Sequence, residues 1–146
     1  MSLFKKITLI IIILSLIALS AASAKDMDDN MIKIKVNDDV FDVELENNSA
    51  TQELLKALEK SNVTVNATDY GNFEKVGDLG FSLPTNDENF NTSPGDIVLY
   101  QGNQISLFYD SHSWSYTKIG KIQNADSNQL KDILGTGDVV LELSLK

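Results

Sequence analysis

Alternating apolar and polar residues near the start of the chain predict a β-hairpin. Residues 31–36, Met-Ile-Lys-Ile-Lys-Val, place apolar and positively charged side chains in turn, and residues 41–45, Phe-Asp-Val-Glu-Leu, do the same with acidic residues. Asn37, Asp38 and Asp39 between them are typical turn residues. Two runs of period two around a short Asn/Asp turn indicate paired antiparallel strands with one solvated, charged face.

Other apolar runs predict further strands along the chain. They are rich in β-branched and aromatic residues and are separated by glycine, asparagine or serine. These strands are expected at residues 63–67, 97–100, 104–109, 116–122 and 139–145.

Helical spacing appears at two places only. Ser49 and Gln52 are spaced as a capping box, and Leu54, Leu55 and Leu58 then form an apolar stripe that ends near Lys60. A second short helix is expected at residues 127–134, where Gly135 ends it. The segment from residue 70 to residue 95 holds four glycines and both prolines, so it is expected to be a long irregular loop.

The order of these elements predicts a mainly β fold. About seven strands with turn signals at regular spacing, and only two short helices, favour a closed or nearly closed antiparallel β-barrel. Closing the sheet would also remove the unpaired strand edges that promote aggregation.

The first 24 residues have the pattern of a secretory signal peptide. Lys5 and Lys6 precede an apolar stretch from Ile7 to Leu19, and Ala22-Ser23-Ala24 fits the small-x-small cleavage site. Cleavage before Lys25 would leave a polar linker at residues 25–30 and one domain at residues 31–146. If cleavage failed, residues 7–24 would remain as a membrane anchor. The protein is therefore expected to be secreted or held at the cell surface.

Charge narrows the range of partners. The chain of 146 residues has a net charge of −9, which becomes −11 if Lys5 and Lys6 leave with the leader. A surface this acidic repels phosphate backbones, so nucleic acid is not expected as a partner, and a membrane only through an uncleaved leader. All twelve positive residues are lysines, and there is no cysteine for disulfides or thiol chemistry.

Four N-x-S/T triplets suggest a glycosylated surface protein when they are read together with the leader. The candidate acceptors are Asn47, Asn62, Asn66 and Asn91.

Four segments in the second half of the chain resemble a known family. Phe81-Ser82-Leu83-Pro84-Thr85, residues 94–100 (Pro-Gly-Asp-Ile-Val-Leu-Tyr), residues 105–109 (Ile-Ser-Leu-Phe-Tyr) and residues 115–122 (Ser-Tyr-Thr-Lys-Ile-Gly-Lys-Ile) follow in this order and spacing. This set is similar to the small bacterial and archaeal cyclophilin-like domains, and it covers about residues 31–146. The resemblance implies a compact β-barrel capped by helices and related in shape to peptidyl-prolyl isomerases.

The resemblance in fold does not imply that this chain has isomerase activity. Isomerases of the wider fold place an arginine beside an apolar pocket, and this chain contains no arginine. Lys118 stands where relatives often have arginine, and its ammonium group lacks the planar fork of a guanidinium. A divergent isomerase therefore remains an alternative, as does a structural module of the cell envelope.

The candidate ligand-binding residues surround a proposed cleft. Aromatic side chains with a polar partner are typical of ligand pockets, and the long loop borders the cleft in the resembling family. These residues are Glu74, Phe81, Tyr109, Trp114 and Lys118. Because side chains alternate along a strand, Thr117 and Ile119 should share one face, with Tyr116 and Lys118 on the other. The Lys118 ammonium is then expected within reach of Glu74 or Tyr109.

The chain has few residues suited to catalysis or to metal binding. His112 is the only histidine, which leaves no pair for a zinc site or a hydrolytic triad, and it is expected to be a solvated loop residue. The acidic groups near Asp28 and Asp87 lack the glycine and terminal glutamate of an EF-hand. We therefore expect binding of a peptide or small molecule, with no catalytic residue, no cofactor and no metal.

Overall fold

A computed structural model describes residues 30–146 of the protein. The predictions of a signal peptide and of a polar linker lie outside these residues. Within the described part, no helix has the length and apolar content needed to cross a membrane.

The described residues form nine strands and two helices. The strands are β1 (Met31–Val36), β2 (Asp39–Leu45), β3 (Val63–Tyr70), β4 (Glu74–Asp78), β5 (Glu88–Asn91), β6 (Asp96–Tyr100), β7 (Gln104–Phe108), β8 (Ser113–Ile122) and β9 (Val139–Leu145). The helices are α2 (Ser49–Lys60) and α3 (Ser127–Leu134).

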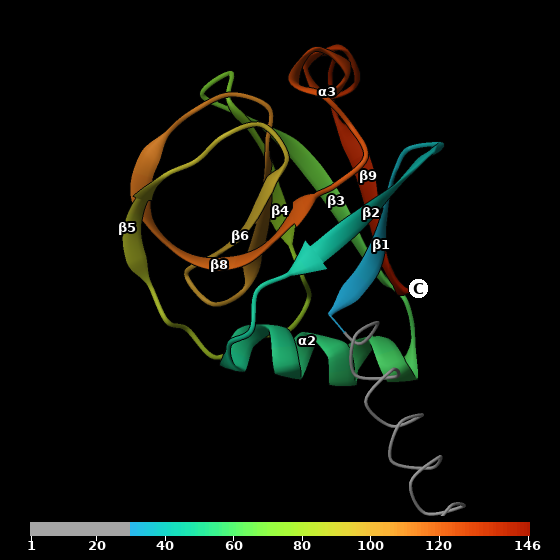
Figure 1. The fold of residues 1–146 in the computed structure, drawn as a ribbon, viewed down its shortest axis with the longest axis vertical. Coiled ribbons are helices and arrows are strands. Elements are labelled where there is room, and N and C mark those ends of the chain that lie inside the picture. Colours follow the sequence, from blue (N-terminus) through green and yellow to red (C-terminus); the bar gives the residue numbers. More distant parts are fainter. Residues whose placement is uncertain (1–29) are drawn as a thin grey trace, which may run out of the picture. The chain divides into compact units, whose positions relative to one another are not determined.

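Eight of the strands close into an antiparallel barrel. Their order is β2-β1-β9-β3-β4-β7-β6-β8, and pairing between β2 and β8 completes the ring (Figure 1). Strand β5 lies outside this ring and pairs with the first residues of β8. The prediction of a closed antiparallel barrel with two short helices is therefore confirmed.

The predicted hairpin is strands β1 and β2. Ile34 pairs with Phe41, and the turn passes through Asn37, whose φ of 51° lies in the left-handed region that asparagine tolerates. The alternate apolar side chains of the hairpin, Ile32, Ile34, Val36, Phe41, Val43 and Leu45, belong to the main core and are almost fully buried, whereas Val40 is exposed.

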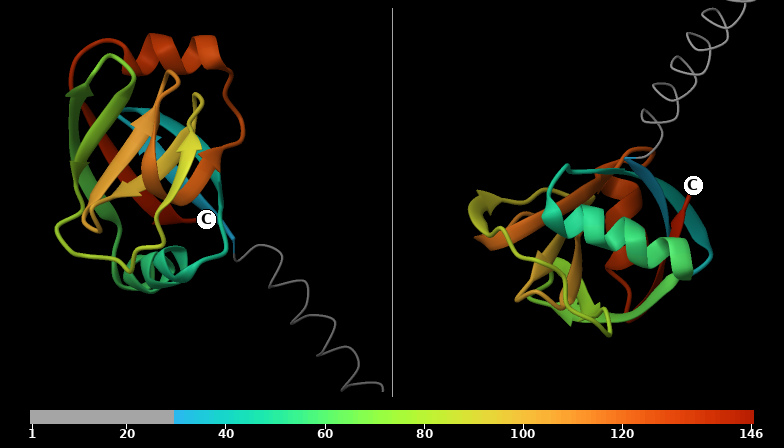
Figure 2. Two further views of the ribbon diagram at one scale, coloured as in Figure 1. Left: turned by 90° about the vertical axis from the view of Figure 1, so that its left-hand side faces the viewer. Right: turned by 90° about the horizontal axis from the view of Figure 1, so that it is seen from below.

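The helices lie over the two ends of the barrel (Figure 2). Leu54 and Leu58 of α2, and Leu130 and Leu134 of α3, are buried in the main core. The capping box of α2 is one residue earlier than predicted. Asn48, not Ser49, accepts from the N–H of Thr51, and the Thr51 hydroxyl accepts from the N–H of Asn48. Asparagine and serine cap equally well, so the local sequence could not decide between them.

The segment 70–95 is not one irregular loop, because it contains β4 and β5. Neither strand has an apolar alternation: Glu74 and Lys75 are both buried, and β5 reads Glu-Asn-Phe-Asn. Pairing of β4 with β3 and β7, and of β5 with β8, makes them strands. Strand formation that depends on neighbours is hard to read from local sequence.

Apolar side chains gather in two places. The main core fills the barrel, whereas a smaller aromatic cluster lies on the outer face of β6, β7 and β8. We call it the outer aromatic cluster; its members are Phe73, Phe90, Val98, Tyr100, Phe108 and Tyr116. Phe90 is the residue through which β5 joins this cluster.

Candidate functional site

Strand β5 is fastened to β8 at both ends. Before the strand, the Asn86 N–H donates to the Thr117 hydroxyl (2.8 Å), which donates to Asp87 Oδ1 (2.5 Å). After it, the Thr92 N–H donates to the His112 carbonyl (2.9 Å), and the His112 N–H donates to Thr92 Oγ1 (3.0 Å). The strand is thus held in place by contacts that leave its outer surface open.

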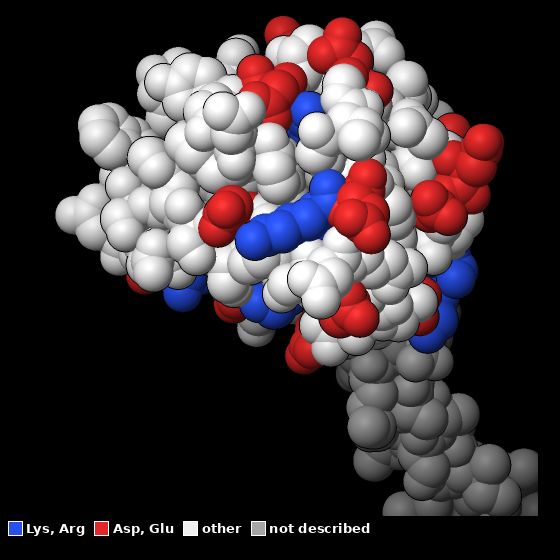
Figure 3. Space-filling view, turned by 90° about the horizontal axis from the view of Figure 1, so that it is seen from above, with Lys and Arg blue, Asp and Glu red and all other residues white. Residues whose placement is uncertain are grey.

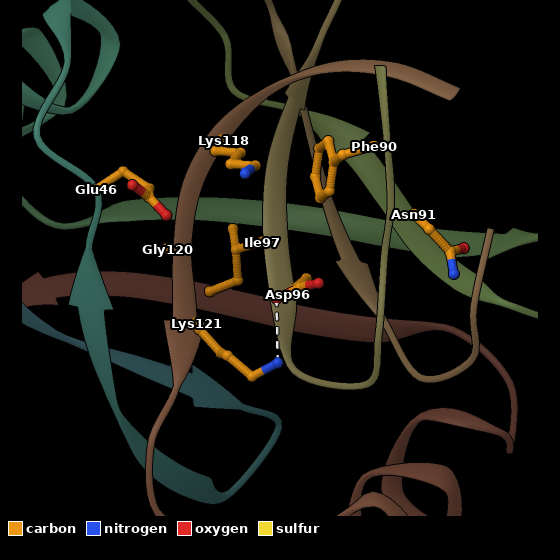
Figure 4. A pocket seen from close by; sticks show the side chains of 8 residues that line it. All are labelled: Glu46, Phe90, Asn91, Asp96, Ile97, Lys118, Gly120 and Lys121. Atoms are coloured by element: carbon orange, nitrogen blue, oxygen red, sulfur yellow. Dashed lines mark hydrogen bonds and ion pairs between the residues drawn. The ribbon is translucent and has the colours of Figure 1, made fainter. Parts of the chain in front are cut away.

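A cavity of about 260 Å³ lies on one side of β5 (Figure 4). We call it the β5 groove. Side chains and backbone from β5, β6, β8 and the end of β2 surround it: Glu46, Phe90, Asn91, Asp96, Ile97, Lys118, Gly120 and Lys121.

Ammonium and carboxylate groups alternate around the β5 groove. Lys121 Nζ lies 3.3 Å from Asp96 Oδ1 and donates to Ser93 Oγ at 2.9 Å. Lys118 Nζ lies 3.2 Å from Glu88 Oε1 and 4.8 Å from the centre of the Phe90 ring. The groove therefore presents both charges next to an aromatic face.

A β-bulge gives the groove its two lysines. The register between β6 and β8 shifts between Ile97 and Val98, so that Ile97 pairs with Gly120 and Val98 with Lys118. The extra residue of a bulge turns both lysines, three positions apart, to the outer side of the strand. A Cβ atom at Gly120 would lie only 2.5 Å from the Glu44 carbonyl oxygen. Because glycine has no Cβ, strand β2 can pack closely against β8 at this point.

Glu74 is a buried carboxyl group at the outer aromatic cluster. Its residue is 7% exposed, and within the described part neither Glu74 Oε2 nor the Ser106 hydroxyl has a hydrogen-bond partner. Burial raises the pKa of Glu74 to about 7, and the negative charge of Asp69 adds to the rise. Burial also raises the pKa of Tyr116, with the charge of Glu74 as the next cause.

Tyr109 lies on the opposite side of the sheet, in the main core. The Tyr109 hydroxyl donates to Asp69 Oδ1 at 2.5 Å. Asp69 Oδ1 also lies 3.2 Å from Lys75 Nζ. Lys75 is 1% exposed and its ammonium is 5.8 Å from the centre of the Tyr109 ring. Burial, followed by the hydrogen bond to Asp69, raises the pKa of Tyr109 to about 12.

The five predicted site residues occupy different environments. Lys118 lines the β5 groove, and Trp114 is exposed at a second cavity beside β5. Glu74 joins the outer cluster, Tyr109 faces the barrel interior, and Phe81 packs half-buried against the main core. The structure therefore does not bring all five to one cleft.

The predicted faces of β8 are confirmed, but the predicted partner of Lys118 is not. Ile119 joins the main core and Tyr116 the outer cluster, while Thr117 is fully buried. Lys118 Nζ pairs with Glu88 and the Phe90 ring instead of Glu74 or Tyr109, because β5 covers that part of β8.

Sequence reasoning missed Phe90, Asp96 and Lys121 as lining residues. The local sequence predicts a loop where β5 lies, and it carries no signal for the bulge that aligns Lys121 with Lys118. His112 also differs from expectation: it is half-buried, with its ring stacked 4.0 Å from that of Phe73.

Metal sites and glycosylation sites are two further classes of candidate site. Among residues 30–146, no three histidine, cysteine or acidic side chains gather as a metal ion would require. The four sequon asparagines, Asn47, Asn62, Asn66 and Asn91, are all exposed on the surface.

A closed eight-stranded antiparallel barrel with one added outer strand and two helices is a cyclophilin-like architecture. The chain belongs to the cyclophilin-like family, whose model matches residues 34–144. A comparison with curated protein sequences finds no match.

Solved structures share this fold at low sequence identity. A hypothetical protein from Archaeoglobus fulgidus is 16% identical with a TM-score of 0.58, over 82% of this chain and 96% of that one. McbB in complex with tryptophan is 12% identical with a TM-score of 0.55, over 79% of this chain and 44% of that one. At these identities the likeness concerns the fold alone.

Proposed function

We propose that this protein is an exported, non-catalytic binding domain whose β5 groove holds a peptide or a small molecule. The observation that supports this most is the groove itself, about 260 Å³ between a fastened outer strand and the barrel wall. A concave site with an aromatic face and a few polar groups is the usual form of a small-ligand pocket. Because hydrogen bonds hold β5 at both ends, little ordering would be needed on binding.

The charges around the groove favour a ligand that carries both signs. Lys118 and Lys121 can receive a carboxylate, while Asp96 and Glu46 can receive an ammonium group. The Phe90 ring offers a surface for an apolar side chain. An amino acid or the end of a short peptide has this chemistry, and a neighbour of the same fold, McbB, is described in complex with tryptophan.

The rival function, peptidyl-prolyl isomerisation, has less support from the residues. The chain has no arginine. Lys118 offers a point charge without the planar fork of a guanidinium, so it does not reproduce the arginine that isomerases of this fold place beside the pocket.

The binding proposal is tested by NMR titration with aromatic amino acids and dipeptides. Saturable amide shifts are expected at Phe90, Lys118, Gly120 and Lys121. Lys118→Ala and Lys121→Ala should each weaken binding about tenfold, as loss of a charged contact does. Lys131→Ala is the matched control, because that lysine also has an acidic neighbour but lies on α3. Shifts confined to other faces, or equal effects of all three variants, would overturn the proposal.

Export rests on the N-terminal pattern and has its own test. Mass spectrometry of the native protein is expected to find a mature N-terminus at Lys25. Glycans on any of the four exposed sequon asparagines would agree with an external location. An intact N-terminus in the membrane fraction would show instead that the leader is kept as an anchor.

A further inference from the structure

A second cavity adjoins β5 and the first residues of β8. It measures about 400 Å³ and is lined by Asn89, Phe90, Asn91, Ser113 and Trp114. Trp114 is 57% exposed, although indole rings are usually largely buried. In the β5–β8 register, Trp114 is the partner of Phe90, and Ser113 is the partner of Asn91. We call this cavity the Trp114 cavity.

No charged residue lines this cavity in an otherwise acidic protein. The nearest charges are a mutually paired set, Lys118 and Glu88, and the Lys118 ammonium contacts the Phe90 ring from the β5 groove. Charged residues make up 23% of the chain, yet residues 89–95 contain none, and residues 111–117 contain only His112 as a possible cation. Figure 3 shows the same contrast: acidic side chains lie over the top, centre and right of this face, while its left part, the side on which β5 lies in Figure 1, is mostly uncharged. A local absence of charge on such a surface selects against ionic ligands, because their charge would find no partner there.

The groups that line the cavity are those that suit a neutral, hydroxyl-rich ligand. An exposed indole offers a flat apolar face and one N–H donor. The side-chain amides of Asn89 and Asn91 each offer donors and acceptors, and the Ser113 hydroxyl offers both. A pyranose ring has the complementary chemistry, with C–H bonds on one face and neutral hydroxyls at the edge.

These groups are also held in position before any ligand binds. The Ser113 hydroxyl donates to Asn91 Oδ1 at 3.1 Å, and the Thr92–His112 hydrogen bonds fix the adjoining end of β5. A fixed arrangement of aromatic and amide groups lowers the entropic cost of binding.

We propose that the Trp114 cavity binds a pyranose unit of a neutral saccharide. This site is separate from the β5 groove, because no lysine and no acidic residue lines it. The two cavities share Phe90 and Asn91, but Lys118 and Lys121 line only the β5 groove and Trp114 lines only the Trp114 cavity. Variants of these three residues therefore test the two sites separately.

The test uses the single tryptophan of the chain as a reporter. Purified protein is titrated with methyl glycosides of glucose, galactose, mannose and N-acetylglucosamine, and with neutral trisaccharides of the same units. A saturable change in indole fluorescence is expected with at least one of them, together with NMR shifts at Asn89, Asn91 and Ser113. Methyl glucuronide should bind more weakly than the matching glucoside.

Variants separate a saccharide site from a general apolar patch. Trp114→Ala should weaken binding at least about tenfold by NMR titration, as loss of a central aromatic contact does. Asn89→Asp should also weaken it, because it removes the amide donors without changing the side-chain size. Tyr70→Ala is the matched control, since that exposed aromatic residue does not line the cavity. No response to any neutral saccharide, or equal binding by Trp114→Ala and the control, would overturn the proposal.

Discussion

The ammonium group of Lys118 lies 4.8 Å from the centre of the Phe90 ring, which joins β8 to the outer strand β5 across the β5 groove. The Phe90 ring also meets Tyr116 edge to face at 5.9 Å. One side chain therefore anchors β5 to the outer aromatic cluster and forms part of both cavities.

Phe90→Ala should loosen β5 while the barrel stays folded. Loss of a half-buried ring and its aromatic contact is expected to lower the free energy of unfolding by about 2 kcal/mol. Hydrogen exchange should speed up for the amides of residues 88–91 far more than for those of β1 and β9. Phe90→Leu, which keeps most of the apolar contact, is the control. Uniform acceleration across the whole barrel would contradict the anchoring role.

Glu74 should make the fold less stable as pH rises. Its pKa is about 7 in the folded protein against a usual value of 4.5, so the folded state holds the proton more tightly. The stabilisation from this proton is fully present below pH 4.5 and is lost as pH rises through 7. The difference between the two pKa values corresponds to a contribution on the order of 3 kcal/mol to the free energy of unfolding.

Urea unfolding of Glu74→Gln at pH 5 and pH 8 measures this effect. The free energy of unfolding of the variant should change less between the two pH values, because the variant has no carboxyl group at this position. At pH 8 the variant should be more stable than the parent, since the parent then buries a charged carboxylate. Glu59→Gln, at an exposed position on α2, is the matched control. Parallel pH profiles for the parent and Glu74→Gln would show that Glu74 is not the group responsible.

Asp69→Asn should destabilise the protein more than Lys75→Met. Lys75 is 1% exposed and its recorded carboxylate partner is Asp69, so the first variant leaves a buried ammonium without a counter-charge. Breaking a buried pair from one side costs about 3 kcal/mol, and the partial exposure of Asp69 lowers this figure. Lys75→Met removes the buried charge and keeps the volume.

Chemical unfolding of both variants tests this order of stability. Asp132→Asn, at an exposed position on α3, is the control for loss of an acidic side chain. A cost for Asp69→Asn no larger than that of Asp132→Asn would mean that Lys75 does not depend on this partner.

Gly120→Ala should weaken closure of the barrel. A Cβ at this position would lie 2.5 Å from the Glu44 carbonyl oxygen and 2.9 Å from a Val43 methyl carbon, where β2 and β8 meet. Crowding of this kind lowers the free energy of unfolding by about 1–3 kcal/mol. Thermal unfolding should show the loss, while Lys121→Ala, the next position on the strand, should change stability little. A fully stable Gly120→Ala would mean that β2 can shift without cost.

Local sequence was sufficient where one element provides its own pattern. The alternation of residues 31–45 predicted the β1–β2 hairpin, because each strand buries one face and exposes the other. The leucine stripe predicted the helix α2, which the structure places over an end of the barrel, and the ordered segments from Phe81 to Ile122 indicated the family. Lys118 and Trp114, two of the predicted site residues, do line the two cavities beside β5.

Tertiary structure decided the features that depend on partners distant in sequence. Glu74 and Lys75 are adjacent residues with no apolar alternation, and β4 forms because β3 and β7 flank it. Strand β5 exists because Thr117 and His112 hold its two ends against β8, which brings Phe90 beside Lys118. The bulge opposite Ile97 then turns Lys121 to the same side. The amino-acid sequence determined which strands and helices can form by themselves. The environment of each charged side chain was set by closure of the barrel, because burial and pairing are properties of the assembled sheet.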